Sequence, residues 1–240
     1  MDPIALALLI FGIMIALMVV RIPIAVAMFV AGTTGYLMQA GWLPYANFLK
    51  TQTYSRFSNY DLSVIPLFLL MGQFATHGGL SRALFSFTNS LMSRVRGGMA
   101  MAAVIACAAF GAVCGSSVAT AATVGTVALP EMTRHGYSGR LTTATLAAGG
   151  TLGIMIPPSV ILVIYAILTE QNIAKLFVAA FIPGLLAALG YMLTVSLYVR
   201  FRPDSAGSQA KATGAVLIAA LIAVWPVMVI FVAVIGGIYS

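Results

Sequence analysis

The amino-acid sequence predicts an all-α integral membrane protein. Hydrophobic residues make up 61% of the chain and charged residues only 7%, whereas about 25% of the residues of a soluble domain are charged. Long uncharged runs follow one another, and none shows the apolar–polar alternation of a strand. Two of these runs are interrupted by glycine, serine and proline. We expect about six transmembrane helices, one re-entrant hairpin and one broken helix.

Six apolar runs are expected to cross the membrane, because each approaches or exceeds the ~17 residues that a short transmembrane helix needs. They are residues 4–20, 22–38, 62–76, 141–169, 176–199 and 212–240. The first run has no basic leader, so we expect it to form a membrane helix rather than a signal peptide. Residues 1–76 are expected to form scaffold-type helices, and residues 171–240 further transmembrane helices.

Two segments between these runs are amphipathic. Residues 39–61 are polar and aromatic, which suits the headgroup region where amphipathic rings settle. In residues 77–96, apolar side chains recur at helical spacing between arginines. We expect this arm helix to lie along the cytoplasmic face as a brace beside the hairpin. A short spanning helix with polar ends is the alternative.

Residues 97–130 predict the re-entrant hairpin. They form 34 consecutive uncharged residues, which as one helix would be about 51 Å long against a hydrocarbon core of about 30 Å. Two full crossings would need about 40 residues and a turn. Arginines flank both ends of the run, so both ends should be cytoplasmic. A hairpin with its tip at Gly115-Ser116-Ser117 satisfies both constraints.

Residues 141–169 predict the broken helix. Pro157 and Pro158 interrupt this uncharged run of 29 residues, because proline lacks the amide hydrogen and clashes with the preceding turn. Gly149, Gly150 and Gly153 precede the prolines and loosen the helix further. We therefore expect one crossing made of two half-helices. With the hairpin it forms a transport-type unit over residues 97–170.

The basic residues give the predicted topology. Positive charge stays on the cytoplasmic side, so the amino terminus is expected outside. Nine basic residues then lie inside and three outside. The nine are Arg21, Arg82, Arg94, Arg96, Arg134, Arg140, Arg200, Arg202 and Lys211, and the three are Lys50, Arg56 and Lys175. Because they are scattered between apolar runs, the formal charge of +7 does not indicate nucleic-acid binding.

The two breaks are expected to form two walls of one binding site. No charged residue falls inside a predicted span, so hydroxyl groups and unwound carbonyl groups are the polar groups available, and these suit Na⁺. The amino-terminal ends of half-helices carry partial positive charge and can face a carboxylate. The candidate substrate-binding residues are Ser117, Thr120, Thr151, Pro158 and Ser159.

Three other interpretations compete with a transport site. Small residues such as Gly115, Ser116 and Thr120 also occur where membrane helices simply pack closely. An intramembrane hydrolase would use Ser117 as nucleophile and His135 as base, but no G-x-S-x-G motif is present and His135 falls in a basic loop. A non-transporting assembly subunit would need no broken helices. We therefore expect no enzymatic activity, no cofactor and no metal beyond Na⁺.

The sequences around the two breaks resemble a known family. GSSVATAATVGTVALPEM (115–132) and TLGIMIPPSVILVIYAILTE (151–170) are similar to the large, DctM-like membrane subunit of tripartite ATP-independent periplasmic (TRAP) transporters. SVIPLFLLMGQFATHGGLSRAL (63–84) and the final GGIYS share this resemblance. It implies a multi-pass, elevator-type secondary transporter of the bacterial inner membrane, driven by Na⁺. The expected substrates are organic acids such as C4-dicarboxylates or sialate, and another ion-coupled carrier is the alternative.

The resemblance also implies partners and an ion site. The partners are a small four-helix membrane subunit, a periplasmic substrate-binding protein and the surrounding lipid. The implied Na⁺-binding residues are Ser116, Ser117, Gly150, Gly153, Ile156 and Pro157. The family consists of two inverted halves, and this chain resembles the first half. Either it is a fragment or another polypeptide completes it, and by itself it is not expected to transport.

Overall fold

The computed structural model describes residues 3–58, 64–207 and 214–239. Each regular element in these ranges is helical, which confirms the all-α prediction. The chain divides into two compact units, residues 1–60 and residues 61–240. Each unit is described by itself below.

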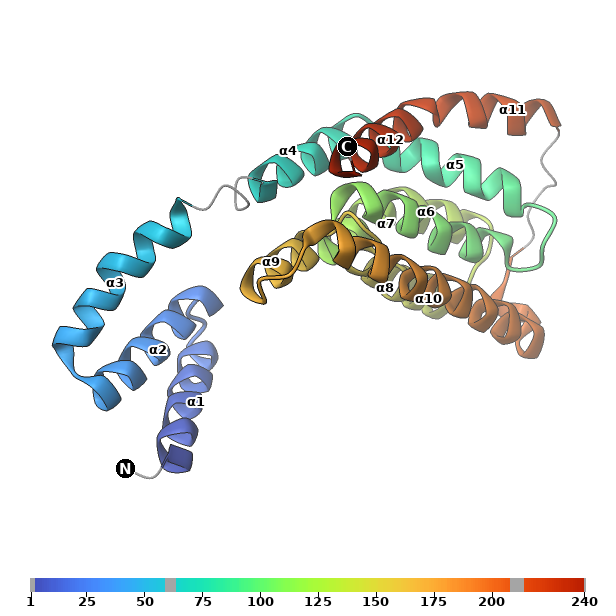
Figure 1. Ribbon diagram of the computed structural model, residues 1–240. Helices are drawn as coiled ribbons and strands as arrows, with labels where there is room; N and C mark the ends of the chain where they lie inside the picture. The colour runs from blue at the N-terminus through green and yellow to red at the C-terminus, as the bar shows by residue number, and fades with distance from the viewer. Residues whose placement is uncertain (1–2, 59–63, 208–213, 240) are drawn as a thin grey trace. The chain divides into compact units, whose positions relative to one another are not determined.

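The first unit contains three helices (Figure 1). They are α1 (Pro3–Val19), α2 (Ile24–Ala40) and α3 (Trp42–Phe57). Helix α2 buries Ala27, Ala31 and Gly35, which recur every four residues and so lie on one face. A Cβ atom added to Gly35 would collide with the side chain of Ile10 in α1, so the absence of a side chain lets the two helices approach closely.

Helix α3 covers the aromatic segment for which the sequence predicts an interfacial position. The Tyr45 hydroxyl lies 2.7 Å from Thr33 Oγ1 of α2. The Tyr36 ring stacks on Phe48 with 5.2 Å between centroids. These contacts hold the aromatic face of α3 against α2, while its position in the headgroup region stays a prediction. Residues 59–61 of the predicted segment lie outside the described residues.

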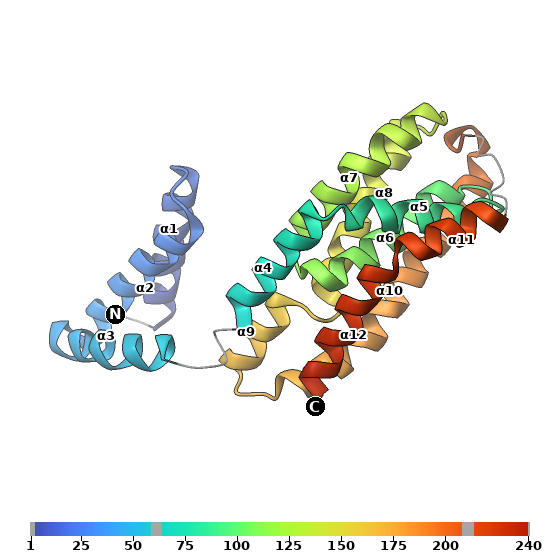
Figure 2. The same cartoon turned by 90° about the horizontal axis from the view of Figure 1, so that it is seen from above.

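The second unit is built around α6, which buries fourteen of its seventeen residues. Figures 1 and 2 show α5, α7, α8 and α10 around it. The α6 sequence is rich in alanine and glycine, which allow neighbouring helices to approach closely. The helices of this unit are α4 (Val64–His77), α5 (Leu80–Met92), α6 (Gly98–Cys114), α7 (Ser117–Arg134), α8 (Gly139–Met155), α9 (Val160–Leu168), α10 (Ile173–Phe201), α11 (Gly214–Ala223) and α12 (Trp225–Tyr239).

Helix α5 is the predicted arm helix, and it packs along the first arm of the hairpin. The Thr88 hydroxyl donates to the carbonyl of Ala102 in α6 at 3.0 Å. The predicted apolar stripe continues to Leu91 and Val95, but both are 46% exposed and α5 ends at Met92. The chain turns there to enter α6. The position of α5 at the cytoplasmic face stays a prediction.

Two helix boundaries differ from the sequence-based expectation. The second arm of the hairpin does not end at Pro130, because α7 continues through this proline to Arg134. The last apolar run is divided at Val224 into α11 and α12. Pro226 lies in the first turn of α12, where a backbone amide has no partner within the helix, so its missing amide hydrogen costs nothing there. In a continuous helix, however, its ring would clash with the carbonyl group of Ile222.

The predicted number of membrane crossings is not settled by helix length. Among the described residues, α10 has 29 residues and is long and apolar enough to cross a membrane. The bent pair α8–α9 passes the same test when taken together. Helices α1, α2 and α6 are apolar but have 17 residues each, or about 26 Å against a core of about 30 Å. Six crossings and a hairpin therefore stay a prediction.

Candidate ion and substrate site

Both predicted breaks are present in the structure. Helix α6 ends at Cys114, Gly115 has a left-handed φ of +64°, and α7 begins at Ser117. Helix α8 ends at Met155, and α9 begins at Val160 after a break of four residues, with a bend of 42° between the two. The chain thus interrupts its helices where glycine and the proline pair predict it.

The tip of the hairpin lies directly against the unwound segment. A Cβ atom added to Gly115 would lie 3.2 Å from the amide nitrogen of Val160 and 3.4 Å from the carbonyl oxygen of Pro158. The positive φ favours glycine at the tip, and the tight space around the added Cβ atom favours it further. The two breaks therefore share one location, as the sequence predicts.

Two glycines of α8 allow the first residues of α7 to come close. A Cβ atom added to Gly153 would lie 3.0 Å from the Ser116 carbonyl oxygen and 2.7 Å from Thr120 Oγ1. A Cβ atom added to Gly150 would lie 3.0 Å from the Ser117 carbonyl oxygen. Backbone oxygens of the tip thus approach the backbone of α8, which a larger residue would prevent.

Four helix termini meet at this location, and they differ in polarity. The carboxyl ends of α6 and α8 carry partial negative charge, while the amino ends of α7 and α9 carry partial positive charge. Ser116 Oγ accepts a hydrogen bond from the Ala119 amide at 3.4 Å and so caps α7. Ser159 stands at the equivalent position of α9, but its side chain makes no capping bond. The first turn of α9 therefore keeps amide groups without a side-chain cap.

Two buried hydroxyl groups near the breaks have no partner. Thr120 and Ser159 are both 0% exposed, and neither hydroxyl oxygen forms a hydrogen bond. Thr120 lies near the Cys114 thiol, without the geometry of a hydrogen bond. An unsatisfied buried hydroxyl costs about 1–3 kcal/mol. Such groups are unusual in folded proteins, and these two hydroxyls are therefore candidate partners for a bound ion or other polar ligand.

Two predicted site residues lie apart from the hairpin tip. Thr151 is exposed on the α10 side of α8, where its hydroxyl donates to the Ala148 carbonyl at 2.7 Å and lies 3.1 Å from the Tyr191 hydroxyl. The side chain of Ile156 packs against α10, because a Cβ atom added to Gly184 of that helix would lie 2.8 Å from Ile156 Cγ1. The structure does not bring Thr151 together with Ser117, and only the backbone of Ile156 is available for a ligand at the tip.

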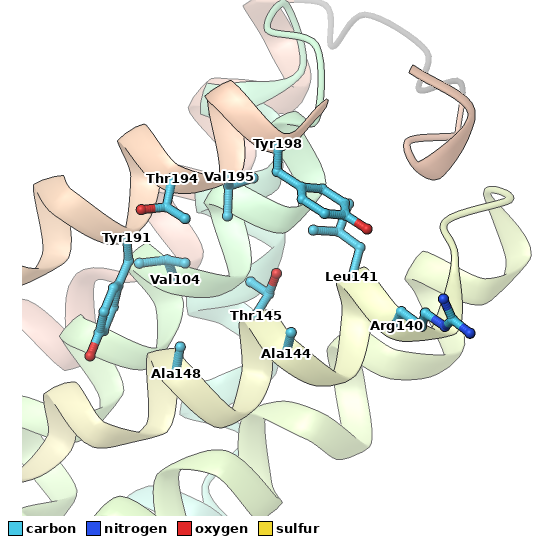
Figure 3. Close-up of a pocket in the computed structure, with 10 residues that line it drawn as sticks. All are labelled: Val104, Arg140, Leu141, Ala144, Thr145, Ala148, Tyr191, Thr194, Val195 and Tyr198. Carbon is cyan, nitrogen blue, oxygen red and sulfur yellow. The ribbon is translucent and has the colours of Figure 1, made fainter. Parts of the chain in front are cut away.

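A hollow that the sequence did not predict lies between α6, α8 and α10 (Figure 3). Its volume is about 340 Å³. Thr145 is buried in its wall, with a hydroxyl that has no partner. The pocket is lined by Val104, Arg140, Leu141, Ala144, Thr145, Ala148, Tyr191, Thr194, Val195 and Tyr198. It shares Tyr191 with the Thr151 contact but does not include the hairpin tip.

The hydrolase alternative does not fit the geometry. Ser117 begins α7, and His135 follows its last residue, so about 27 Å of helix separates the two residues. His135 Nδ1 lies 2.9 Å from the Glu131 carbonyl oxygen, close to its own helix end. A general base must lie within hydrogen-bonding reach of the nucleophile. Ser117 and His135 therefore cannot form a catalytic pair.

Apolar helices interrupted at two facing points are typical of ion-coupled membrane carriers, in which broken helices bind ions and substrate. The comparison with known proteins specifies the class further. Residues 11–240 match the family model of the tripartite ATP-independent periplasmic transporter, DctM component. The chain belongs to this family.

The chain is similar to several curated relatives. It is 41% identical to a C4-dicarboxylate TRAP transporter large permease protein of Pseudomonas aeruginosa over 80% of this chain and 44% of the relative. It is 33% identical to the protein of that name in Vibrio cholerae, over 97% of this chain and 51% of the relative. An isethionate TRAP transporter permease protein of Oleidesulfovibrio alaskensis is 33% identical to this chain, over 96% of this chain and 36% of the relative. The chain spans about half the length of the curated relatives it matches.

Proposed function

We propose that this chain provides one half of the membrane permease of a Na⁺-coupled TRAP transporter. The complete transporter imports an organic acid across the bacterial inner membrane, by an elevator-type movement of the unit that carries the two breaks. A periplasmic binding protein delivers the substrate, and a small four-helix membrane subunit completes the membrane part. Family membership and the permease names of the relatives support the transport role.

The observation that carries the proposal is the contact between the hairpin tip and the unwound segment. Carbonyl oxygens of Ser116 and Ser117 approach α8 there, and the unpartnered Thr120 hydroxyl lies beside them. Oxygen ligands without formal charge suit Na⁺, and the carboxyl ends of α6 and α8 favour a cation. The groups present therefore fit the proposed ion.

The substrate side of the site is proposed at the amino end of α9. Its uncapped amides and the free Ser159 hydroxyl can donate hydrogen bonds to a carboxylate. The proposed ion-binding and substrate-binding residues therefore lie in different parts of the site. Thr120 is fully buried between α6, α7 and α8 and fits an ion ligand better than a substrate contact, whereas Ser159 fits a substrate contact.

The test is uptake into proteoliposomes that contain the complete transporter with its partners. We expect radiolabelled C4-dicarboxylate or sialate to accumulate with an inward Na⁺ gradient and not with K⁺ and a pH gradient. Ser159→Ala should reduce uptake, because it removes a donor at the proposed substrate position. Ser86→Ala, an exposed serine of α5, is the matched control. Uptake that proceeds equally in K⁺ would show that the proposed ion is wrong, and absence of uptake under each gradient would favour an assembly role.

A further inference from the structure

A hollow with several polar side chains in its wall lies at the joint between α4 and α5, on the side of α7. Its volume is about 500 Å³. It is lined by Thr76, His77, Gly79, Ser81, Arg82, Ala122, Thr123, Thr126 and Val127. Thr123 is six residues beyond Ser117 on α7, about 9 Å along the helix. The hollow is therefore separate from the hairpin tip.

The electrostatic environment of this hollow is positive. Helix α5 begins after Gly79, which has a φ of +73° and provides no capping side chain. The amides of Leu80 and Ser81 make no backbone hydrogen bond, so the positive end of α5 is open. Arg82 is exposed and forms no ion pair with a described residue. The lining contains no carboxylate.

Two hydroxyl groups of the lining are free. Ser81 is only 4% exposed, yet its hydroxyl makes no hydrogen bond with a described residue and borders the hollow. The Thr123 hydroxyl, on the opposite wall, also has no partner there. The Ser81 side chain is almost fully enclosed, so a group bound in the hollow would be the partner that its hydroxyl lacks among the described residues. This is evidence for a ligand that is independent of the helix terminus.

Neighbouring charges do not cancel this positive environment. The nearest acidic residue on α7 is Glu131, one turn beyond Val127. Its carboxylate oxygens lie 3.7 Å from the Arg134 guanidinium and 3.7 Å from His135 Nδ1. Both interactions direct Glu131 to the end of α7 and away from Arg82. A negative ligand at the hollow would thus meet attractive groups and little repulsion.

We propose that this hollow is a second binding site, for the carboxylate or phosphate group of a small anion. The oxyanion accepts hydrogen bonds from the Ser81 amide and from the Ser81 and Thr123 hydroxyls, and Arg82 provides the counter-charge. The ligand thereby connects the start of α5 with the second arm of the hairpin. The site does not depend on the Na⁺ site proposed above, because the two share no residue.

The experiment measures succinate binding to the full purified chain in phosphatidylcholine nanodiscs, by isothermal titration calorimetry in Na⁺-free choline buffer. Choline removes the ion proposed for the hairpin tip, and Arg82 lies outside that site, so the dependence of binding on Arg82 distinguishes the two sites. We expect Arg82→Gln to weaken binding at least ~10-fold and Ser81→Ala ~3-fold, in line with the loss of charged and neutral hydrogen bonds. Arg82→Lys should retain part of the affinity.

Arg94→Gln is the matched control, because Arg94 is an exposed arginine just beyond the other end of α5. It should bind succinate as the wild type does. Thermal unfolding without ligand verifies that each variant is folded. If a folded Arg82→Gln variant binds succinate with unchanged affinity, or if Arg94→Gln loses as much, the site does not exist as proposed.

Two further arms identify the source of the oxyanion. Inorganic phosphate in place of succinate tests whether any small oxyanion binds. Phosphatidylglycerol in the nanodiscs tests whether a lipid headgroup occupies the hollow. If phosphate or phosphatidylglycerol competes with succinate, and the competition requires Arg82, the result supports an oxyanion site and identifies which ligand occupies it. Binding that is insensitive to Arg82 in all three arms would overturn the proposal.

Discussion

Replacing Gly153 with alanine tests whether the close contact between α8 and the hairpin tip holds the site together. The added Cβ atom would lie 2.7 Å from Thr120 Oγ1, 3.0 Å from the Ser116 carbonyl oxygen and 3.3 Å from Gly111 Cα. Two of these neighbours are backbone atoms, which cannot rotate away. The variant must therefore separate α8 from the start of α7 by several tenths of an ångström.

The expected destabilisation follows from two opposing effects. Overpacking a tight interior costs about 1–3 kcal/mol, while glycine to alanine in a helix gains up to about 1 kcal/mol. We expect Gly153→Ala to lose about 1–2 kcal/mol, or about 2–8 °C in Tm for a chain of this size. Gly190→Ala in α10 is the control, because nothing lies within 4 Å of its added Cβ atom. That variant should gain up to about 1 kcal/mol.

The assay is thermal unfolding of each variant in detergent, followed by circular dichroism at 222 nm, in Na⁺ and in choline buffer. If the site binds Na⁺, the wild type and Gly190→Ala should be more stable in Na⁺. Gly153→Ala should lose most of this difference, because the ligand carbonyls move apart. A Gly153→Ala variant as stable as Gly190→Ala, with the same response to Na⁺, would refute the close contact that the reasoning requires.

Three further predictions concern the same unit. In proteoliposome uptake measured against Na⁺ concentration, Pro157→Ala should impair Na⁺ dependence more than Ser117→Ala. A rewound helix withdraws several carbonyl groups, whereas the serine variant removes at most one hydroxyl. Unchanged Na⁺ dependence in Pro157→Ala would show that the unwound segment is not part of the Na⁺ site. Cysteines introduced at residues 115–117 should resist impermeant reagents added outside; labelling from outside would contradict a cytoplasmic hairpin. Tyr137→Phe should cost about 1 kcal/mol in thermal unfolding, because the Met99 amide loses its acceptor. Burial raises the pKa of Tyr137, in the loop after α7, above 10.0, so the wild type should lose stability as pH rises through that raised value and Tyr137→Phe should lose less.

The breaks were predictable from the sequence because their causes are local. Glycine at the tip and the proline pair at residues 157–158 act on their own backbone, and the structure interrupts its helices at both places. The division at Val224 had the same kind of signal in Pro226, but a uniformly apolar run concealed it. The all-α class was predictable for the same reason, since the length of each uncharged run and its lack of strand-type alternation can be read in each segment separately.

Features that depend on distant contacts were not predictable. The contact between Thr151 and Tyr191 joins residues 40 positions apart, and only the packing of α8 on α10 reveals it. The hollow around Thr145 arises in the same way. The prediction of Ser159 as a site residue rested on its type and on its place beside the prolines. Its lack of a capping bond became visible only once α9 had a defined first turn.

The polarity of the four helix termini offers a physical basis for coupling in the proposed transporter. A cation at the carboxyl ends of α6 and α8 would lie close to an anion at the amino end of α9, since Gly115 contacts both Pro158 and Val160. Opposite charges about 4–6 Å apart attract by a few kcal/mol at the intermediate dielectric of such a site. Each ligand then raises the affinity for the other by the same factor, as thermodynamic linkage requires. Na⁺ would thus promote carboxylate binding without direct contact with the substrate. If so, the Kd of the substrate in the complete transporter should fall as the Na⁺ concentration rises. Ser159→Ala should weaken the effect of substrate on Na⁺ binding by the same factor as it weakens the effect of Na⁺ on substrate binding.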